Sequence, residues 1–582
     1  MKTTTLDGKT PDIAEENIGK LKQLFPEVFT EGKIDFEKLQ QVLGEYVEDS
    51  NERYNFTWNG KGRALRLSQT PSLGTLRPCK EESKDWDTTQ NLYIEGDNLE
   101  VLKLLQKSYY GKVKLIYIDP PYNTGKDFVY KDDFHDNLEN YKKITGQVDD
   151  SGNALSTNTE ASGRYHTDWL NMMYPRLRLA RNLLSDDGVI FVSVDYNEFA
   201  NAKKILDEIF GEDNFQREII WRIGWLSGYK TAAPNFIRNH DTILMYSKNQ
   251  NMFTFNKKYI ENKNFKPLIK LDSNLKTKLE SLGLSRSQQS ELLQFINHDN
   301  RPDRYAIEDT WNCNEYDDLN SIAIVSFSGE KISKILDIDQ DFKGQKSIKM
   351  IQRIIEASAN EGDIVMDFFS GTASTAHALM RFNAEDSGNR KFIMVQLPEI
   401  TDENSEAYKA GYKNICEIGK ERIRRAGEKI KQEYKDKAGI ENLDIGFKVF
   451  KLDTSNIRKW QPDYDNLEQS LLDYIDNFVE GRTELDVVYE IMLKYGLDLT
   501  YPVDEFTIAG KKVYSIGYGM LMICLDNEIT TEVAKGILTK IKELSPESSR
   551  VVFKDNGFKS DSNKTNIKEI LKSGGIEEFI TI

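Results

Sequence analysis

Short apolar runs alternate with segments of helical periodicity over most of the chain. Such runs are typical of strands that are buried on both faces of a parallel sheet. The predicted strands cover residues 91–97, 114–118, 188–195, 218–222, 242–247, 363–369 and 391–397. The predicted helices cover residues 98–109, 169–184, 198–210, 345–359, 375–382 and 405–434. Because strand–helix–strand units require right-handed crossovers, the pattern predicts an α/β fold with a mostly parallel sheet.

Three parts of the chain depart from this alternation. The N-terminal part contains a predicted helical pair, around 13–25 and 36–47, followed by a turn-rich stretch. The middle part is polar and lysine-rich, which indicates a module inserted between two halves of the α/β domain. The C-terminal part contains a predicted hairpin over 511–530 with its turn at 517–519, and indicates a small α+β domain. The predicted boundaries are 1–90 for the N-terminal appendage, 91–250 and 341–440 for the two halves, 251–340 for the insert and 441–582 for the C-terminal domain.

The composition is that of an ordinary soluble protein. The chain has 582 residues, 39% of them hydrophobic and 30% charged, which is enough for several domains. No apolar run approaches the length needed to span a membrane, and residues 1–11 lack the apolar core of a signal peptide. Four cysteines lie far apart, without disulfide or metal-ligand spacing. These features predict a cytoplasmic protein without a membrane anchor.

The net charge of −16 lowers the expectation of DNA binding, but the charge is unevenly distributed. Residues 216–310 carry 15 Lys and Arg against 10 Asp and Glu, a net charge of +5. Residues 452–582 carry 15 against 23, a net charge of −8. Aromatic residues are interleaved with the basic residues of 216–310, which favours a DNA-binding face over a basic surface on a small core.

The strand at 114–118 ends in Asp119-Pro120-Pro121-Tyr122, and the chemistry is predicted there. Functional groups of open α/β sheets lie beyond the carboxyl ends of strands. An aromatic exocyclic amine is a poor nucleophile because its lone pair is delocalised into the ring. Asp119 and the Pro120 carbonyl can each accept one amine hydrogen bond, which exposes the lone pair for attack on a sulfonium methyl. Tyr122 can stack on an extruded base. The alternative is an ordinary strand followed by a proline turn.

The strand at 363–369 runs into a small-residue turn at 370–375 and then a helix. Such a turn lets the backbone approach a ligand, although the same pattern also describes an ordinary βα turn. Glu399 closes the next strand and can accept hydrogen bonds from both ribose hydroxyls, as acidic residues do in dinucleotide folds. Asp97 closes another strand and can accept from an adenine amine. Acidic groups at three strand ends together favour a nucleoside cofactor.

Two other motifs have weaker interpretations. Residues 224–231 resemble a phosphate-binding loop, but Tyr229 stands where that loop requires glycine, which argues against an ATPase. Pro78-Cys79 resembles the nucleophile dipeptide of enzymes that methylate the cytosine ring carbon. This dipeptide follows a turn rather than a buried strand, so Cys79 is interpreted as incidental.

Longer segments around these sites resemble the β-class amino-methyltransferases of DNA, and in particular the modification (Mod) subunits of type III restriction–modification systems. In that class Asp-Pro-Pro-Tyr precedes the cofactor loop, with target recognition between them, and this chain has the same order. The segments that carry the resemblance are 91–102, 118–125, 169–177 and 550–558. The resemblance covers nearly the whole chain except the insert.

The resemblance implies a Rossmann-like, mostly parallel seven-stranded methyltransferase sheet, with an inserted target recognition domain and added N- and C-terminal domains. It implies catalytic roles for Asp119, Pro120, Pro121 and Tyr122. It also implies a binding site for S-adenosylmethionine. The residues implied for that site are Asp97, Lys346, Ser347, Asp367, Phe369, Ser370, Gly371, Thr372 and Glu399.

Three positions depart from the family pattern. Phe368 stands where the cofactor loop commonly has proline, and Ala373 stands where it commonly has its second glycine. Ser347 follows Lys346 in a motif that usually reads Lys-Pro. We expect Ala373 to narrow the space beside the cofactor, which bears on affinity more than on activity.

The chain is therefore identified as a member of this family, with the function of a site-specific DNA adenine N6-methyltransferase that flips its target base. The resemblance implies double-stranded DNA, a second copy of the chain and a restriction subunit with ATPase and nuclease as partners, and no metal in the chemistry. Two alternatives stay open: methylation of the cytosine N4 amine, and a non-catalytic DNA-recognition subunit with a decayed cofactor loop. Aspartate at position 119 favours adenine, because the cytosine enzymes more often have serine there. The insert offers no readable recognition sequence.

Overall fold

The computed structural model describes most of the chain. The described residues are 2–5, 10, 12–30, 33–43, 55–124, 165–222, 236, 238, 240–265, 267–311, 332–337, 346–458, 478–576 and 578–582. The stretch that resembles a phosphate-binding loop, with Tyr229, lies outside them, as does part of the predicted insert.

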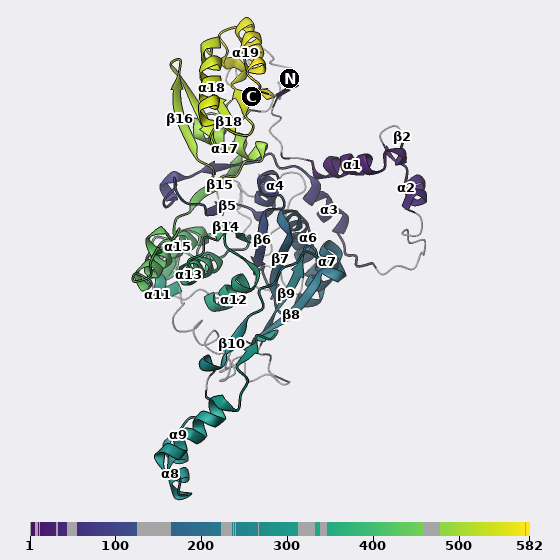
Figure 1. Ribbon diagram of the computed structural model, residues 1–582. Coiled ribbons are helices and arrows are strands. Elements are labelled where there is room, and N and C mark those ends of the chain that lie inside the picture. Colours follow the sequence, from purple (N-terminus) through teal and green to yellow (C-terminus); the bar gives the residue numbers. More distant parts are fainter. Residues whose placement is uncertain are drawn as a thin grey trace.

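A large sheet forms the centre of the molecule (Figure 1). Within the described ranges it has ten strands. Their order across the sheet is β12 (Thr310–Trp311), β8 (Phe215–Arg222), β9 (His240–Ser247), β7 (Leu184–Val194), β6 (Val113–Ile118), β13 (Ile364–Asp367), β14 (Lys391–Gln396), β5 (Leu92–Glu95), β15 (Lys448–Thr454) and β4 (Gly74–Pro78). Of these ten, β9 and β4 run against the direction of the others. The sheet is therefore mostly parallel, and the predicted Rossmann-like α/β class is confirmed, with ten strands in the described sheet where the resemblance implied seven.

Seven of the strands correspond to the predicted ones, and β4, β12 and β15 extend the sheet at its two edges. β15 pairs in parallel with β5, and β4 pairs antiparallel with β15. This pairing places Lys451 opposite Arg77, residues from distant parts of the chain. A local pattern of apolar residues does not reveal such pairing, because it carries no information about distant partners.

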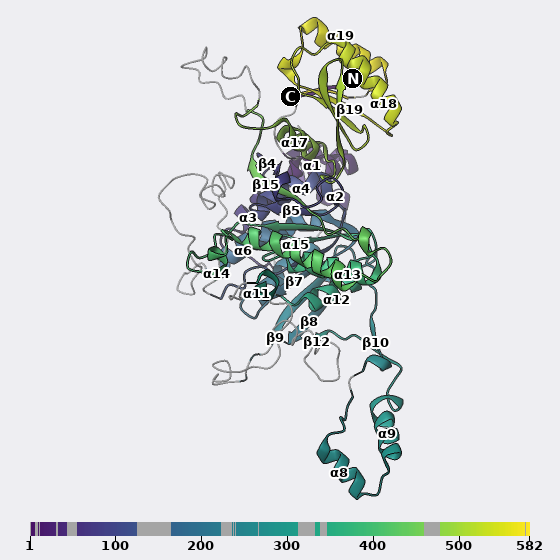
Figure 2. The ribbon, with the colours of Figure 1, turned by 90° about the vertical axis from the view of Figure 1, so that its left-hand side faces the viewer.

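Helices cover both faces of the sheet (Figures 1 and 2). Strand β6 shows the two layers, since Ile116 and Ile118 pack into one hydrophobic cluster and Leu115 and Tyr117 into the other. Burial on both faces explains the continuous apolar run of this strand. The helices on the first face are α4 (Asn98–Tyr109), α6 (Tyr165–Leu183) and α7 (Phe199–Phe210). Those on the second face are α12 (Ile348–Ser358), α13 (Ser374–Asp386) and α15 (Ile415–Glu433).

The predicted helix over 405–434 is wrong as one element, because the structure divides it in two. α14 covers Glu406–Lys409, and α15 begins at Ile415. Between them Gly411 has a φ of +101°, a conformation that favours glycine and cannot continue a helix. The side chain of Asn414 then accepts a hydrogen bond from a backbone N–H of the first turn of α15, as an N-cap residue does.

A second sheet forms the C-terminal domain, which lies at the top of Figure 1. Its strand order is β1 (Lys2–Thr5), β20 (Glu578–Thr581), β19 (Arg550–Phe553), β18 (Leu521–Cys524), β17 (Lys511–Ile516) and β16 (Val503–Ile508). Its helices are α17 (Glu484–Tyr495), α18 (Thr531–Leu544) and α19 (Asp561–Ser573). The predicted hairpin is present as β17 and β18, and Gly517 and Gly519 in its turn have φ angles of 58° and 92°. Strand β1 pairs in parallel with β20, so the two ends of the chain lie close together.

Two helical pairs project from the main body (Figure 1). The N-terminal pair, α1 and α2, agrees with the predicted one. In the predicted insert, α8 and α9 form an arm that extends beyond the short ladder of β10 and β11 (Figures 1 and 2). These and the remaining elements are α1 (Ile13–Leu24), α2 (Phe36–Leu43), α3 (Lys61–Gln69), α8 (Ser273–Ser281), α9 (Arg286–Gln294), α11 (Ile332–Leu336), β2 (Phe29–Thr30), β3 (Lys33–Ile34), β10 (Tyr259–Glu261) and β11 (Arg304–Ala306). In the part of the chain that the structure describes, every helix is too short or too polar to cross a membrane.

Candidate active site

Four neighbouring parallel strands, β6, β13, β14 and β5, end at the same edge of the central sheet. The predicted acidic site residues lie at these ends: Asp119 after β6, Asp367 in β13, Glu399 beyond β14 and Asp97 beyond β5. The chain continues from β6 to one side of the sheet and from β13 to the other. The boundary between β6 and β13 is therefore the topological switch point, where open α/β sheets bind ligands. The structure brings the predicted catalytic and cofactor segments together there.

The loop that follows β6 is fixed to helices on the first face of the sheet. The indole Nε1 of Trp169 in α6 donates a hydrogen bond of 2.7 Å to the carbonyl of Pro121. Asn123 adopts a left-handed conformation with a φ of 59°, which asparagine tolerates better than most residues. Its side-chain amide donates to the carboxylate of Glu198 at 2.5 Å and to the carbonyl of Tyr165 at 3.1 Å. These bonds connect the loop to α6 and to Glu198, the residue before α7.

The side chain of Asp119 is mostly buried, with 21% of it exposed. Its Oδ1 atom accepts no well-directed hydrogen bond from the described residues. Burial raises the pKa of this carboxyl above its ordinary value, while the positive charge of Lys346 lowers it. An oxygen of this kind is available to accept a hydrogen bond from a ligand.

The ammonium of Lys346 lies between several groups of the predicted catalytic loop. Its Nζ is 3.3 Å from Asp119 Oδ1, donates to the hydroxyl of Tyr122, and lies 4.6 Å from the centroid of the Tyr122 ring. The motif of Lys346 implies a cofactor contact, whereas the structure places its charge against the catalytic loop. Ser347 is fully buried, and its hydroxyl accepts a hydrogen bond from the backbone N–H of Met350 at the start of α12.

Two residues of this site were not among the predicted site residues. Asp241 Oδ2 lies 3.7 Å from Lys346 Nζ, and the Trp221 ring centroid lies 5.4 Å from the same atom. The two residues are directly opposite each other in the β8–β9 pair. Asp241 directly precedes the predicted strand 242–247, so its place in the sequence was a signal. The rule that functional groups follow the carboxyl ends of strands does not find Asp241. Because β9 runs antiparallel, its amino end rather than its carboxyl end lies at the site.

The predicted cofactor loop follows β13 and is stabilised from within by Asp367. The carboxylate of Asp367 accepts hydrogen bonds from the backbone N–H of Phe369 at 3.0 Å and from the hydroxyl of Thr375 at 2.6 Å. Burial raises the pKa of Asp367 to about 7. Both carboxylate oxygens are thus used inside the loop, and Asp367 shapes the turn.

The outer side of this loop offers groups that a ligand can use. The Ser370 hydroxyl is buried and has no well-directed hydrogen-bond partner in the described ranges. Gly371 has a φ of +51°, and a Cβ atom added to it would meet no other atom within 4 Å. A side chain from α15 supports the loop, since Arg422 donates to the Thr372 hydroxyl at 2.9 Å and to the Ser374 hydroxyl at 2.8 Å. A polar ligand can therefore approach the backbone at Gly371.

The structure gives Asp97 a structural role. Its Oδ1 accepts from the backbone N–H of Glu100 as the N-cap of α4, and its Oδ2 lies 3.2 Å from the guanidinium of the buried Arg176. The neighbouring Asn98 donates to the carbonyl of Phe368 at 2.7 Å, which joins this strand end to the cofactor loop. Glu399 is half-buried, and its backbone carbonyl accepts from the N–H of Ile415 at 3.0 Å.

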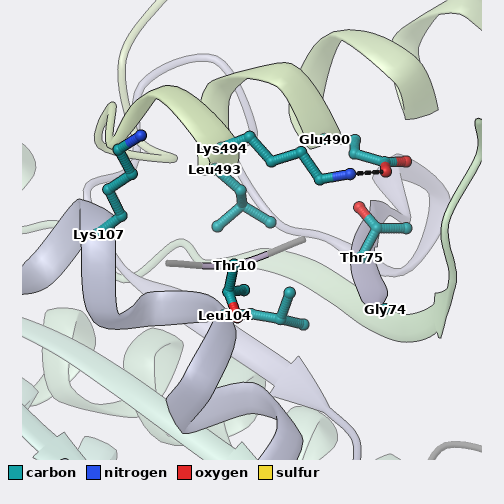
Figure 3. Close-up of a pocket in the computed structure, with 8 residues that line it drawn as sticks. All are labelled: Thr10, Gly74, Thr75, Leu104, Lys107, Glu490, Leu493 and Lys494. Carbon is teal, nitrogen blue, oxygen red and sulfur yellow. Dashed lines mark hydrogen bonds and ion pairs between the residues drawn. The ribbon is translucent and has the colours of Figure 1, made fainter. Parts of the chain in front are cut away.

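Cys79 lies away from this edge and has no properties of a nucleophile. Burial raises the pKa of its thiol to about 12, so the thiol stays protonated at neutral pH. A small pocket lies between α4, β4 and α17 (Figure 3). Its free volume is about 10 Å³, which is room for one water molecule. Lys494 forms an ion pair with the buried Glu490 in this pocket, which therefore serves packing and is too small for an organic ligand.

Comparisons with known proteins agree with this geometry. A model of the DNA methylase family matches residues 113–428, a range that includes both the catalytic loop and the cofactor loop. The chain is 30% identical to the type III restriction-modification enzyme EcoP15I Mod subunit of Escherichia coli, over 98% of each chain. It is 28% identical to the EcoPI Mod subunit of Escherichia phage P1, also over 98% of each chain. It is 29% identical to the StyLTI Mod subunit of Salmonella typhimurium, over 79% of this chain and 76% of the relative. The chain therefore belongs to the DNA methylase family, within the group of type III Mod subunits.

Proposed function

We propose that this DNA methyltransferase transfers a methyl group from S-adenosylmethionine to the N6 amine of a flipped adenine, as the Mod subunit of a type III restriction–modification system. The observation that carries the proposal is the mostly buried Oδ1 of Asp119, which accepts no well-directed hydrogen bond from the described residues and has the Lys346 ammonium 3.3 Å away. It lies on a proline-rigid loop at the topological switch point. The cofactor loop lies directly beside it, at the end of the neighbouring strand β13.

The catalytic loop prepares the amine for reaction. Asp119 Oδ1 accepts one hydrogen bond from the N6 amine, the Pro120 carbonyl accepts the other, and Tyr122 stacks on the base. Both acceptors favour an amine nitrogen that is becoming positively charged. The nitrogen–methyl bond would form as the sulfonium–methyl bond breaks, which leaves a neutral thioether. The methylated nitrogen would then lose one proton, and the Asp119 carboxylate is the acceptor placed to receive that proton. The raised pKa of this buried carboxyl suits such a step.

The loop after β13 has the features that a sulfonium nucleoside needs. S-adenosylmethionine, when bound, supplies an electrophilic methyl group. The Ser370 hydroxyl and the open space at Gly371 accommodate its polar part, and Thr372, fixed by Arg422, completes the loop. Phe369 remains a candidate cofactor contact, and Glu399 is the candidate for the ribose hydroxyls. Asp97 remains the candidate contact for the adenine ring of the cofactor, although its carboxylate is also engaged in capping α4.

The proposed partners are double-stranded DNA, a second copy of the chain and a restriction subunit. The relatives named above are Mod subunits of type III enzymes, which supports a restriction partner for this chain. The net charge of +5 in residues 216–310 and the projecting arm of α8 and α9 support DNA contact through the inserted domain 251–340. The predicted domain boundaries at 90, 250, 340 and 440 are kept as part of this proposal.

The second candidate reaction is methylation of the cytosine N4 amine, which the same acceptor geometry permits. Single-molecule sequencing of DNA from cells that express the chain separates the two reactions. We expect N6-methyladenine at one position of a short motif. N4-methylcytosine, or no modified base in cells that make the folded protein, would contradict the proposal. Titration with S-adenosylmethionine separates a non-catalytic recognition subunit, which would show no binding, from an enzyme.

A further inference from the structure

Lys346 carries a positive charge between two carboxylates at the catalytic loop. The exposed fractions of its side chain and of those of Asp119 and Asp241 are 9%, 21% and 15%. The rings of Tyr122 and Trp221 border the same ammonium. Lys346 Nζ is therefore surrounded by carboxylates and aromatic faces, the groups that stabilise a nitrogen that gains positive charge. These surroundings resemble in kind those that the proposed mechanism gives to the target amine.

Lys346 and the target amine compete for the same atom. The proposed mechanism requires Asp119 Oδ1 to accept a hydrogen bond from the base, and Oδ1 is the atom that pairs with Lys346 Nζ at 3.3 Å. A buried ammonium without a partner is costly, so the lysine needs a second carboxylate when it leaves the first. Asp241 Oδ2, at 3.7 Å, is within reach of a small change in the lysine side-chain torsions.

We propose that Lys346 and Asp241 are positioning residues for methyl transfer: Lys346 pairs with Asp119 while the base pocket is empty, and shifts to Asp241 when the base amine binds. The inference rests on the proposed function and deepens it. In this arrangement the lysine keeps Asp119 ionised for the incoming amine, and Asp241 keeps the lysine paired during the reaction. Neither residue bonds to the methyl group or to the reacting nitrogen.

The charged surroundings of Asp119 fix the direction of the expected pH effects. The titratable groups that face it are Lys346, Asp241, Tyr117, Tyr122 and Asp367. Burial raises the pKa of both phenols well above the ordinary value, so these groups are neutral. Asp367 is present in all the variants of the test, so its effect on Asp119 does not differ among them. Removing the Lys346 charge therefore raises the pKa of Asp119, and removing the Asp241 charge lowers it.

The test is the pH dependence of single-turnover methyl transfer to duplex DNA by the full-length protein. For Lys346→Met, we expect the acidic limb of the rate profile to move to higher pH by about one to three units. For Asp241→Asn, we expect the limb to move to lower pH. The matched control is Lys114→Met, which removes another buried lysine, paired with Asp187 and located near the other end of β6. Its limb should coincide with that of the wild type.

Several results would overturn the inference. One is a Lys346→Met profile that keeps the wild-type limb with only a lower plateau, as a purely structural defect would give. Another is a shift of both variants in the same direction. A second measurement uses 2-aminopurine at the target position, where Asp241→Asn should show less flipped-base fluorescence because the lysine then stays on Asp119; an unchanged signal contradicts the exchange. A wild-type protein that methylates no DNA at any pH would overturn the proposed function, and this inference with it.

Discussion

The indole nitrogen of Trp169 donates a hydrogen bond of 2.7 Å to the backbone carbonyl of Pro121. Trp169 is 1% exposed and belongs to the helix that follows the catalytic loop along the chain. The bond therefore ties the loop that carries Asp119 and Tyr122 to the hydrophobic core. Catalytic groups must hold their geometry within fractions of an ångström, so this tie bears directly on the rate.

Trp169→Phe removes this hydrogen bond and keeps most of the packing. We expect kcat to fall about three- to tenfold, the equivalent of one net hydrogen bond, with an unchanged Kd for S-adenosylmethionine. The matched control is Trp58→Phe, because the Trp58 indole also donates to a residue of α6, Asn171, at 2.8 Å. Steady-state methylation rates compare the variants. Equal rates for both would show that the tie to Pro121 does not position the loop.

Two residues of the cofactor loop, Gly371 and Ala373, have positive φ angles of 51° and 60°. Substitutions at these two positions are predicted to have opposite effects on cofactor binding. The Gly371 Cα faces open space, whereas the Ala373 methyl is fully buried in the hydrophobic core. Gly371→Val places a side chain in the proposed cofactor space at a φ of +51°, and we expect binding of S-adenosylmethionine to weaken by at least about tenfold. Ala373→Gly should leave the Kd within about threefold, because the methyl is buried in the hydrophobic core, whereas the expectation from the sequence was that it narrows the space beside the cofactor. Isothermal titration measures both.

The buried carboxyl of Asp367 predicts a pH dependence of stability. Its pKa is about 7 in the folded protein, above the ordinary value of 3.8. Between these pH values the folded state holds a proton that the unfolded state has released, so this group's contribution to stability is full at low pH and is lost as the pH rises towards 7. Asp367→Asn removes the titration while keeping an acceptor for the Phe369 N–H.

Urea unfolding at a series of pH values checks this expectation. As the pH rises from 3.8 to about 7, the unfolding free energy of the wild type should fall relative to that of Asp367→Asn. Other titrating groups, such as the buried His377, are common to both proteins and cancel in the difference. A difference that does not vary with pH would show that Asp367 is ionised in the folded state throughout.

Much of the fold was predictable from the sequence, because parallel strands covered on both faces appear as continuous apolar runs. Strand β6 is the clearest example, since all six of its residues are buried. The helix broken at Gly411 was not predicted, because its charged face continues across the break while the backbone does not. Strands β4, β12 and β15, which extend the predicted sheet on its two sides, were missed as members of the sheet, since their pairing depends on distant residues.

The candidate site was predictable to the same degree. A segment that directly follows a predicted strand, such as the one with Asp119 and Pro120, can be placed at the carboxyl edge of the sheet from the sequence alone. Lys346 and Tyr122 are 224 positions apart, and only the fold shows that the lysine faces the catalytic loop. Asp241 lies at the amino end of an antiparallel strand, a place that rules for parallel strands overlook.

Methyl transfer by Asp119→Ala tests the central claim most directly. We expect the purified wild-type protein, with S-adenosylmethionine and duplex DNA that contains its site, to produce N6-methyladenine, detected by mass analysis of the nucleosides. Asp119→Ala should produce none, because the amine loses its carboxylate acceptor. Its Kd for DNA should stay within about threefold, since the flipped base is the one part of the DNA that Asp119 contacts in the proposed mechanism. Methylation by this variant at the wild-type rate would contradict the proposed mechanism.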